Sequence, residues 1–172
     1  MDQNSGMDPA PPVYAALDAL GIRYERHEHP AVFNIEDASK HWNPIAGVQC
    51  KNLFLRNKKG DTHYLVVVGI DKRVDLKDLV KVVGDDRLSF GSPERLMAAL
   101  GLTPGSVSPF GLLNDADGSV RVLVDQDLRG AARLLFHPNI NTATVVVSWV
   151  DLERFLATRA NRVRLVSLRA AE

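Results

Sequence analysis

One lysine stands where the surrounding sequence calls for an apolar residue. The stretch VQCKNLFLRNKKGDTHYLVVV, residues 48–68, predicts two strands joined by a tight turn. Because side chains alternate along a strand, Lys51 shares a face with Leu53 and Leu55. An inward-pointing lysine is costly unless it is paired or borders a wet cleft. The pattern alone favours a lysine whose ammonium reaches solvent at the start of the strand. The alternative is a cation at a cleft edge, placed for a phosphate or a developing oxyanion.

Two polar segments could supply the rest of a site. In FHPNINTAT, His137 ends an apolar strand and is followed by Asn139, Asn141, Thr142 and Thr144. Sites often lie where strands run into polar loops, although an ordinary turn accounts for this segment equally well. In PGSVSPFG, successive backbone amides near glycine could form a nest for an anion or oxyanion. Taken alone, this second segment is more typical of a turn.

The remaining reactive side chains favour structural interpretations. Cys50 is the only cysteine, so it cannot form an intramolecular disulfide, and in an apolar strand it is expected to be a small buried hydrophobe rather than a nucleophile. His27 and His29 share a strand face, but no carboxylate or cysteine stands at ligand spacing, so no metal site is expected.

Basic residues gather in two places along the sequence. The turn containing Arg56, Lys58 and Lys59 is typical of a solvated hairpin tip. The second cluster is more typical of helix-end and surface charge, with an RNA-binding patch as the alternative. Its members are Arg154, Arg159, Arg162, Arg164 and Arg169.

The elements that position these residues alternate between helical and strand patterns. Helices are predicted around VYAALDAL, NIEDASKHW, DLKDLVKVV, SPERLMAAL and SWVDLERFLATR. Strands are predicted in IRYERHE, in the two arms of the hairpin, and in VRVLVD, RLLFHP, ATVVVS and RVRLVSL. LTPGSVSPFG is too rich in Pro, Gly and Ser for regular structure and is expected to be a structured loop. The order predicts one α/β (α+β) domain, with helices packed around a central mixed, mostly antiparallel sheet.

The composition of the chain limits which functions and locations are plausible. The 172 residues carry 21 Lys and Arg against 21 Asp and Glu, so net charge gives no general case for nucleic-acid binding. The single cysteine and the lack of a signal peptide or apolar spanning run predict a cytoplasmic protein that does not enter membranes. The polar, Pro-rich start predicts a flexible tail over residues 1–10 and a single domain over residues 11–172.

Taken in order, the motifs resemble a known family. CKNLFLRNKKG, YLVVV, RLSFGSPERLMAALGLTPGSVSPFGLLND, VLVDQDL and LLFHPNINTAT together resemble the YbaK and prolyl-tRNA-synthetase-associated editing domains. The resemblance covers residues 10 to 160. It is nearest to the free-standing branch that removes alanine wrongly attached to proline tRNA. The domain over residues 11–172 is therefore expected to be such an editing domain, with an α/β fold and no metal or organic cofactor.

The resemblance also implies roles for residues. Lys51, Gly105 and His137 match family positions expected to be catalytic. The expected substrate-binding residues are Asn52, Ser106, Val107, Ser108, Pro109, Asn139 and Thr142. The implied reaction is hydrolysis of the ester between an amino acid and the terminal ribose of tRNA. The loop from Gly105 to Pro109 would cradle the aminoacyl end, and Lys51 would hold the terminal phosphate or the carbonyl.

The sequence is consistent with more than one partner and more than one function. The implied partner is mischarged proline tRNA, with prolyl-tRNA synthetase as a second candidate partner. A non-catalytic tRNA-binding or nucleic-acid-binding module could use the same fold. A transcription regulator is less consistent with the sequence, because no helix-turn-helix with a basic recognition helix is evident.

Overall fold

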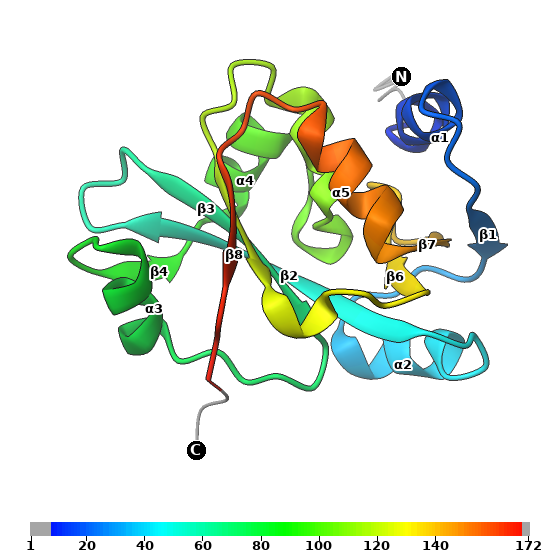
Figure 1. Ribbon diagram of the computed structural model, residues 1–172, viewed down its shortest axis with the longest axis horizontal. Helices are drawn as coiled ribbons and strands as arrows, with labels where there is room; N and C mark the ends of the chain where they lie inside the picture. Colours follow the sequence, from blue (N-terminus) through cyan, green and yellow to red (C-terminus); the bar gives the residue numbers. More distant parts are fainter. Residues whose placement is uncertain (1–7, 170–172) are drawn as a thin grey trace, which may run out of the picture.

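A single mixed sheet organises the chain. The computed structural model describes residues 8–169, and within them eight strands form one sheet in the order β1-β7-β6-β2-β3-β5-β8, with β4 paired to β2 (Figure 1). The strands are β1 (Glu25–Glu28), β2 (Val48–Asn57), β3 (His63–Gly69), β4 (Leu88–Phe90), β5 (Arg121–Asp125), β6 (Leu134–Phe136), β7 (Ala143–Val147) and β8 (Val163–Val166). Four of the pairings are antiparallel and three are parallel, which confirms the expected mixed sheet.

Five α-helices lie where the sequence predicts them. They are α1 (Ala10–Ala19), α2 (Ile35–Trp42), α3 (Leu76–Val83), α4 (Pro93–Leu100) and α5 (Trp149–Ala157). The caps follow the expected chemistry: the side chains of Asn34, Ser92 and Ser148 accept hydrogen bonds from backbone amides in the first turns of α2, α4 and α5. Gly84 and Gly101 adopt left-handed conformations that end α3 and α4.

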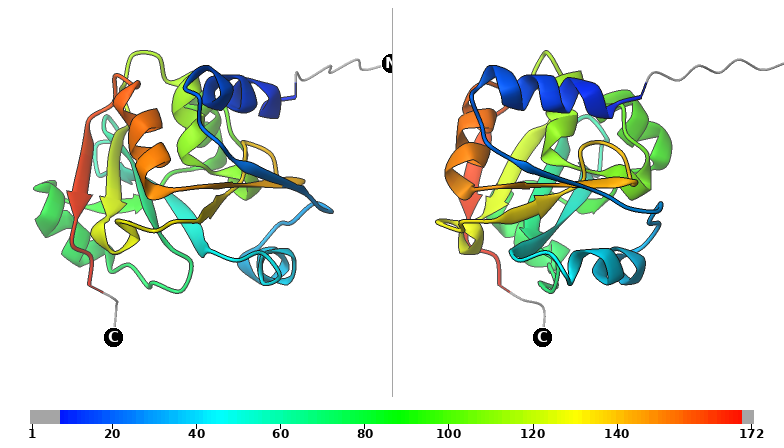
Figure 2. Two further views of the ribbon diagram at one scale, coloured as in Figure 1. Left: turned by 45° about the vertical axis from the view of Figure 1, so that its right-hand side comes forward. Right: turned by 90° about the vertical axis from the view of Figure 1, so that its right-hand side faces the viewer.

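The helices divide between the two faces of the sheet (Figure 2). On one face, α1, α4 and α5 bury the largest core, which includes Leu17, Leu96 and Phe155. The other face is covered in two separate places. Leu79 of α3 packs with Leu55 of β2, whereas Trp42 of α2 packs with Leu135 of β6. The sheet surface between α2 and α3 is therefore free to border a cleft.

The pairing of β2 is interrupted on one side. Along one edge, β2 forms a parallel pairing with β6 only at Val48 and Gln49. Farther along the same edge it forms an antiparallel pairing with β4, only from Leu55 to Asn57. Between these pairings, residues 50–54 have a partner strand only on the β3 side. Strands β2 and β6 thus begin together and then diverge, which opens the sheet beside Lys51.

Three features differ from the sequence prediction or extend it. Strand β4 was not predicted, because its three residues are too few to show a period. The loop LTPGSVSPFG contains two 3₁₀ segments, η1 (Pro104–Ser106) and η2 (Pro109–Asn114). Residues 1–7 of the expected tail lie outside the described residues, whereas Ala10 is buried as the first residue of α1.

Candidate active site

The opening beside β2 holds a pocket of about 250 Å³. Its lining comes from four parts of the chain: the segment leading into α2 together with α2 itself, β2 with the end of β3, η1 with the residue after it, and the end of β6. The lining residues are Val32, Phe33, Asn34, Ile35, Ala38, Trp42, Cys50, Lys51, Asn52, Leu53, Ile70, Pro104, Gly105, Val107 and His137. The pocket brings together Lys51, Asn52, Gly105, Val107 and His137, all of which the sequence analysis singled out.

Lys51 enters the pocket as a partly buried cation. Among residues 8–169, no carboxylate forms an ion pair with its ammonium. Burial lowers the pKa of Lys51 from its usual value; Asp71 opposes this effect and Arg73 adds to it. The structure therefore supports the cleft interpretation of Lys51 over the interpretation in which it simply extends into bulk solvent.

Asn52 ties the strand to the glycine-containing loop. Its side-chain amide donates a hydrogen bond to the backbone carbonyl of Val107 at 3.2 Å. Its Oδ1 atom is buried and has no hydrogen-bond partner among the described residues. A buried acceptor left unpaired is costly, and this one belongs to a side chain that lines the pocket.

Only part of the loop from Gly105 to Pro109 faces the pocket. Gly105 and Val107 line it, whereas Ser106, Ser108 and Pro109 are buried behind them. The Ser108 hydroxyl accepts a hydrogen bond from the Phe110 amide and caps η2. Ser106, Ser108 and Pro109 therefore shape the loop, and their buried positions do not support the expected direct contact with substrate.

The hydrogen bonds of His137 define its free nitrogen. Its Nδ1 lies 3.0 Å from the backbone oxygen of Ala143, which can only accept, so Nδ1 carries the proton. Burial lowers the pKa of His137 below its usual value, and the nearby His29 lowers it further, whereas the Ala143 contact raises it. A neutral ring with a protonated Nδ1 leaves Nε2 as a hydrogen-bond acceptor beside the pocket.

The structure adds Trp42, which the sequence did not mark as a site residue. Trp42 lines the pocket, stacks at a tilt against His137 with ring centroids 5.1 Å apart, and donates its indole N–H to the Thr144 hydroxyl at 2.6 Å. Thr144 is fully buried and also contacts His29 Nε2 at 2.8 Å. These bonds fasten the end of α2 to β7. The spacing of Ala38 and Trp42, four residues apart in a short polar helix, was the available signal for an inward face.

Two expected substrate-binding residues lie elsewhere. Asn139 is buried, with a φ of 64°, and donates to the Phe110 carbonyl at 3.3 Å, so it supports the loop. Thr142 is exposed and its carbonyl accepts from the His29 amide. Neither residue lines the pocket, so the HPNINTAT segment contributes only His137 to the lining.

The structure also bears on two other possible chemistries, a cysteine nucleophile and a metal site. Cys50 is 2% exposed and burial raises its pKa to about 12, as expected for an inert thiol. Residues 8–169 contain no cluster of three or more His, Cys, Asp or Glu side chains suited to a metal ion. None of the five helices just described is long and apolar enough to span a bilayer.

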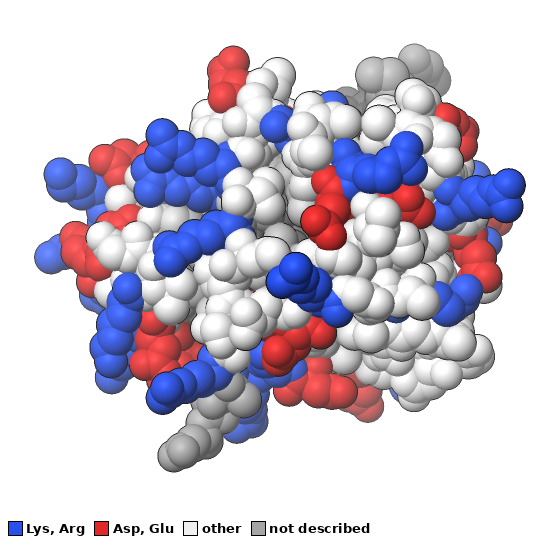
Figure 3. All heavy atoms as spheres, viewed as in Figure 1, with Lys and Arg blue, Asp and Glu red and all other residues white. Residues whose placement is uncertain are grey.

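The C-terminal arginines lie away from the pocket, on the part of the molecule that carries α5 and β8. Figure 3 shows basic and acidic side chains mixed on this face. Arg154 pairs with Asp151, and the Arg164 guanidinium donates to the Val82 carbonyl. These contacts agree with the surface-charge interpretation, and the RNA-patch alternative gains no support from them.

Comparisons with known proteins agree on one family. Residues 29–155 match the model of the aminoacyl-tRNA editing domain. The prolyl-tRNA editing protein ProX of Acetoanaerobium sticklandii is 44% identical over 162 residues, covering 94% of this chain and 99% of the relative. The prolyl-tRNA synthetase associated domain-containing protein 1 of Mus musculus is 37% identical over 144 residues, covering 81% and 85%.

Solved structures support the same fold. A crystal structure described as a candidate trans-editing enzyme for prolyl tRNA synthetase matches with a TM-score of 0.74 at 22% identity, covering 95% of this chain and 98% of the other. The hypothetical protein APE2540 matches with a TM-score of 0.70 at 16% identity, covering 91% and 97%. At these identities the comparison concerns the fold alone, and it confirms the predicted α/β architecture.

Proposed function

Because this chain belongs to the aminoacyl-tRNA editing domain family, we propose that it hydrolyses the ester of mischarged tRNA in trans, with Ala-tRNA(Pro) as its substrate. Water adds to the ester carbonyl, the bond from the carbonyl carbon to the ribose oxygen breaks, and the products are a free amino acid and a ribose hydroxyl. The partner is proline tRNA, by analogy with the names of the relatives. The expectations of an editing domain over residues 11–172 and of a cytoplasmic location belong to the same proposal.

The observation that carries the proposal is the unpaired Lys51 ammonium in a small pocket. An aminoacyl ester is already activated, so its hydrolysis needs a positioned water and stabilisation of an oxyanion more than a strong nucleophile. Lys51 supplies positive charge for the oxyanion or for the terminal phosphate of the tRNA. Partial burial strengthens this effect, because water screens the charge less.

His137 and Asn52 orient the substrate in this proposal. The His137 Nε2 atom accepts a hydrogen bond, which suits the α-ammonium group of the amino acid or the attacking water. Asn52 lines the β2 side of the pocket and, through its hydrogen bond to the Val107 carbonyl, positions the loop against the substrate. Gly105 lets the loop backbone approach the aminoacyl end without a side chain in the way.

Selectivity follows from the size of the pocket. A synthetase site built for proline cannot strongly exclude the smaller alanine, which loses only about 1–3 kcal/mol of binding there. The pocket walls here include Val32, Ala38, Trp42 and Leu53; most come from the α2 region, and Leu53 is a strand leucine from β2. The hydrogen bond from its indole N–H to Thr144 holds the Trp42 ring in place, which makes this wall rigid. Forcing a proline ring into a rigid pocket typically costs about 1–3 kcal/mol, or about fivefold to 150-fold in rate.

Turnover separates this proposal from its rival, a non-catalytic tRNA-binding module. We expect the protein to release many equivalents of labelled alanine from Ala-tRNA(Pro), and to release serine from Ser-tRNA(Pro) more slowly. The matched control is the same assay with protein unfolded by heat. Binding of the tRNA without release of amino acid above the spontaneous rate would exclude the hydrolase and favour the binding module.

A further inference from the structure

A large aromatic ring stands exposed at the rim of the pocket. Phe33 is 76% exposed, although it lies between the buried Val32 and the cap of α2. It belongs to none of the apolar clusters of the core and stacks on no other ring among the described residues. Ile35, two residues later, is also exposed and also lines the pocket. The rim is thus apolar where the pocket opens to solvent.

The backbone on both sides of Phe33 is anchored. The Val32 amide donates to the Asn141 carbonyl at 3.2 Å, and the Asn141 side-chain amide donates back to the Val32 carbonyl at 2.9 Å. On the other side, the Asn34 side chain accepts from the Asp37 amide at 2.8 Å. The backbone that carries the ring is therefore held in place, so binding has to order only the side-chain torsions of Phe33.

We propose that Phe33 is the platform on which the terminal adenine base of the tRNA stacks while its aminoacyl group occupies the pocket. This inference rests on the proposed function. The amino acid and the adenine are joined through a single ribose, so an amino acid in the pocket holds the base close to the pocket rim. Phe33 is an aromatic side chain at that rim with its ring open to solvent.

Phenylalanine suits a base that need not be read. It has no hydrogen-bonding group, and stacking of bases on aromatic rings is tolerant of base identity. Every tRNA ends in the same adenosine, so discrimination at this position has no use. The editing site would then recognise the end of the tRNA by stacking and the amino acid by size.

Two small esters isolate the stacking contribution. One is 2′(3′)-O-alanyladenosine; the other is the alanyl ester of 1,4-anhydroribitol, which has the sugar ring but no base. We expect the wild-type protein to have a higher kcat/KM for the ester with the base, and Phe33→Ala to bring the ratio of the two values toward one. The expected fall in the ratio is about fivefold to 150-fold, the range covered by stacking one base on an aromatic side chain. Phe33→Trp should keep the ratio.

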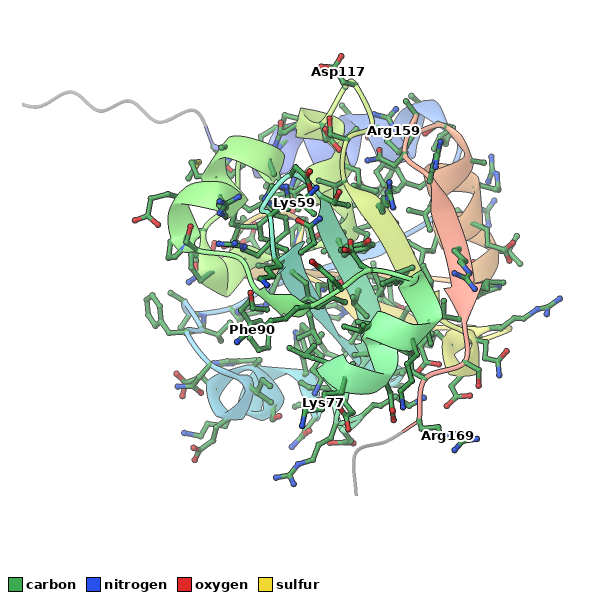
Figure 4. The ribbon with its side chains drawn as sticks, turned by 90° about the vertical axis from the view of Figure 1, so that its left-hand side faces the viewer. Lys59, Lys77, Phe90, Asp117, Arg159 and Arg169 are labelled. Atoms are coloured by element: carbon green, nitrogen blue, oxygen red, sulfur yellow. The ribbon has the colours of Figure 1, made fainter. Side chains whose placement is uncertain are left out.

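Phe90 provides a matched control. It is 63% exposed, belongs to β4 and does not line the pocket (Figure 4). Phe90→Ala should leave the ratio unchanged. The inference is overturned if the wild-type protein hydrolyses both esters and Phe33→Ala leaves their ratio intact, or if Phe90→Ala lowers it equally. Hydrolysis of neither ester, nor of Ala-tRNA(Pro), would instead remove the proposed function on which the inference rests.

Discussion

Two lysines, Lys51 on β2 and Lys72 in the segment that follows β3, are both partly buried, yet their surroundings are opposite. The Lys72 ammonium lies 2.5 Å from an Asp125 oxygen and 2.6 Å from an Asp127 oxygen, and it also donates to the Leu168 carbonyl. Lys51 lacks any such carboxylate partner among residues 8–169 and faces a pocket.

The pKa values of the two lysines move in opposite directions. Burial lowers the pKa of both, but the ion pairs of Lys72 with Asp125 and Asp127 outweigh it and raise the pKa of Lys72. A raised lysine pKa stabilises the folded state at every pH below the usual lysine value, and that contribution is lost as the pH rises through the folded-state pKa. A lowered pKa is a cost to folding. Lys72 therefore serves the fold, whereas Lys51 is retained at the expense of stability.

Removing the Lys51 charge should have the largest effect on activity. Lys51→Met keeps the length of the side chain and deletes the ammonium, so we expect deacylation to fall about 10²- to 10³-fold, as for loss of one oxyanion-stabilising donor. The melting temperature should stay the same or rise. Alanine release and circular dichroism measure the two quantities. Lys77→Met, on the exposed side of α3, is the control and should change neither (Figure 4).

Removing the Lys72 charge should give the converse result. Asp125 is only 1% exposed, so Lys72→Met leaves a buried carboxylate without its cation. We expect a loss of about 2–3 kcal/mol in the free energy of unfolding, the scale of a hydrogen bond to a charged group. Alanine release per folded molecule should be retained. Urea denaturation measures the loss, and the double variant Lys72→Met, Asp125→Leu should recover part of it. A variant as stable as wild type would break the contrast between the lysines.

The pH profile should reflect the neutral form of His137. Because burial lowers its pKa below the usual 6.5, the rate should stay level as the pH falls through 6.5 and decline only at more acidic pH. The unfolded chain takes up this proton first, so stability also falls below pH 6.5, and circular dichroism must confirm folding at each point. His137→Gln should remove the acidic limb and lower the rate about 10- to 100-fold, the scale of one hydrogen bond to a charged group. If the acidic limb of the pH–rate profile is unchanged in His137→Gln, or is lost in the control His27→Gln, the assignment of this limb to His137 is contradicted.

Adding one methyl group to the loop should have the smallest effect. A Cβ on Gly105 would meet the Val32 carbonyl at 3.5 Å and the Asn141 side chain at 3.7 Å, both ordinary contacts, so Gly105→Ala should fold normally. In a pocket of about 250 Å³ the methyl should crowd the substrate and slow release about tenfold. Gly69→Ala is the control, because a Cβ there meets nothing within 4 Å and lies outside the pocket lining. Equal rates for the two variants would remove Gly105 from the site.

The sequence predicted the elements well where the signals are local. Capping residues such as Asn34, Ser92 and Ser148 act within one turn, and alternation along β2 marked Lys51 as unusual. The motif resemblance identified the family, which the comparisons confirm.

The sequence could not supply the parts that depend on long-range packing. The short pairing of β2 with β6 and the hydrogen bond from Trp42 to Thr144 each involve residues about a hundred positions apart in the sequence. Closeness in sequence was also a poor guide to the pocket lining. Asn139 and Thr142 follow His137 closely, yet the chain turns at Asn139, which has a positive φ, and neither residue lines the pocket.

The most direct test of the account is single-turnover hydrolysis of Ala-tRNA(Pro) and Pro-tRNA(Pro) by the wild-type, Lys51→Met and Lys72→Met proteins under one set of conditions. The wild-type and Lys72→Met proteins should release alanine rapidly and proline slowly, and Lys51→Met should release alanine about 10²- to 10³-fold more slowly than the wild type. Equal rates for alanine and proline, or rapid release of alanine by Lys51→Met, would contradict a size-selective editing site built on an unpaired lysine.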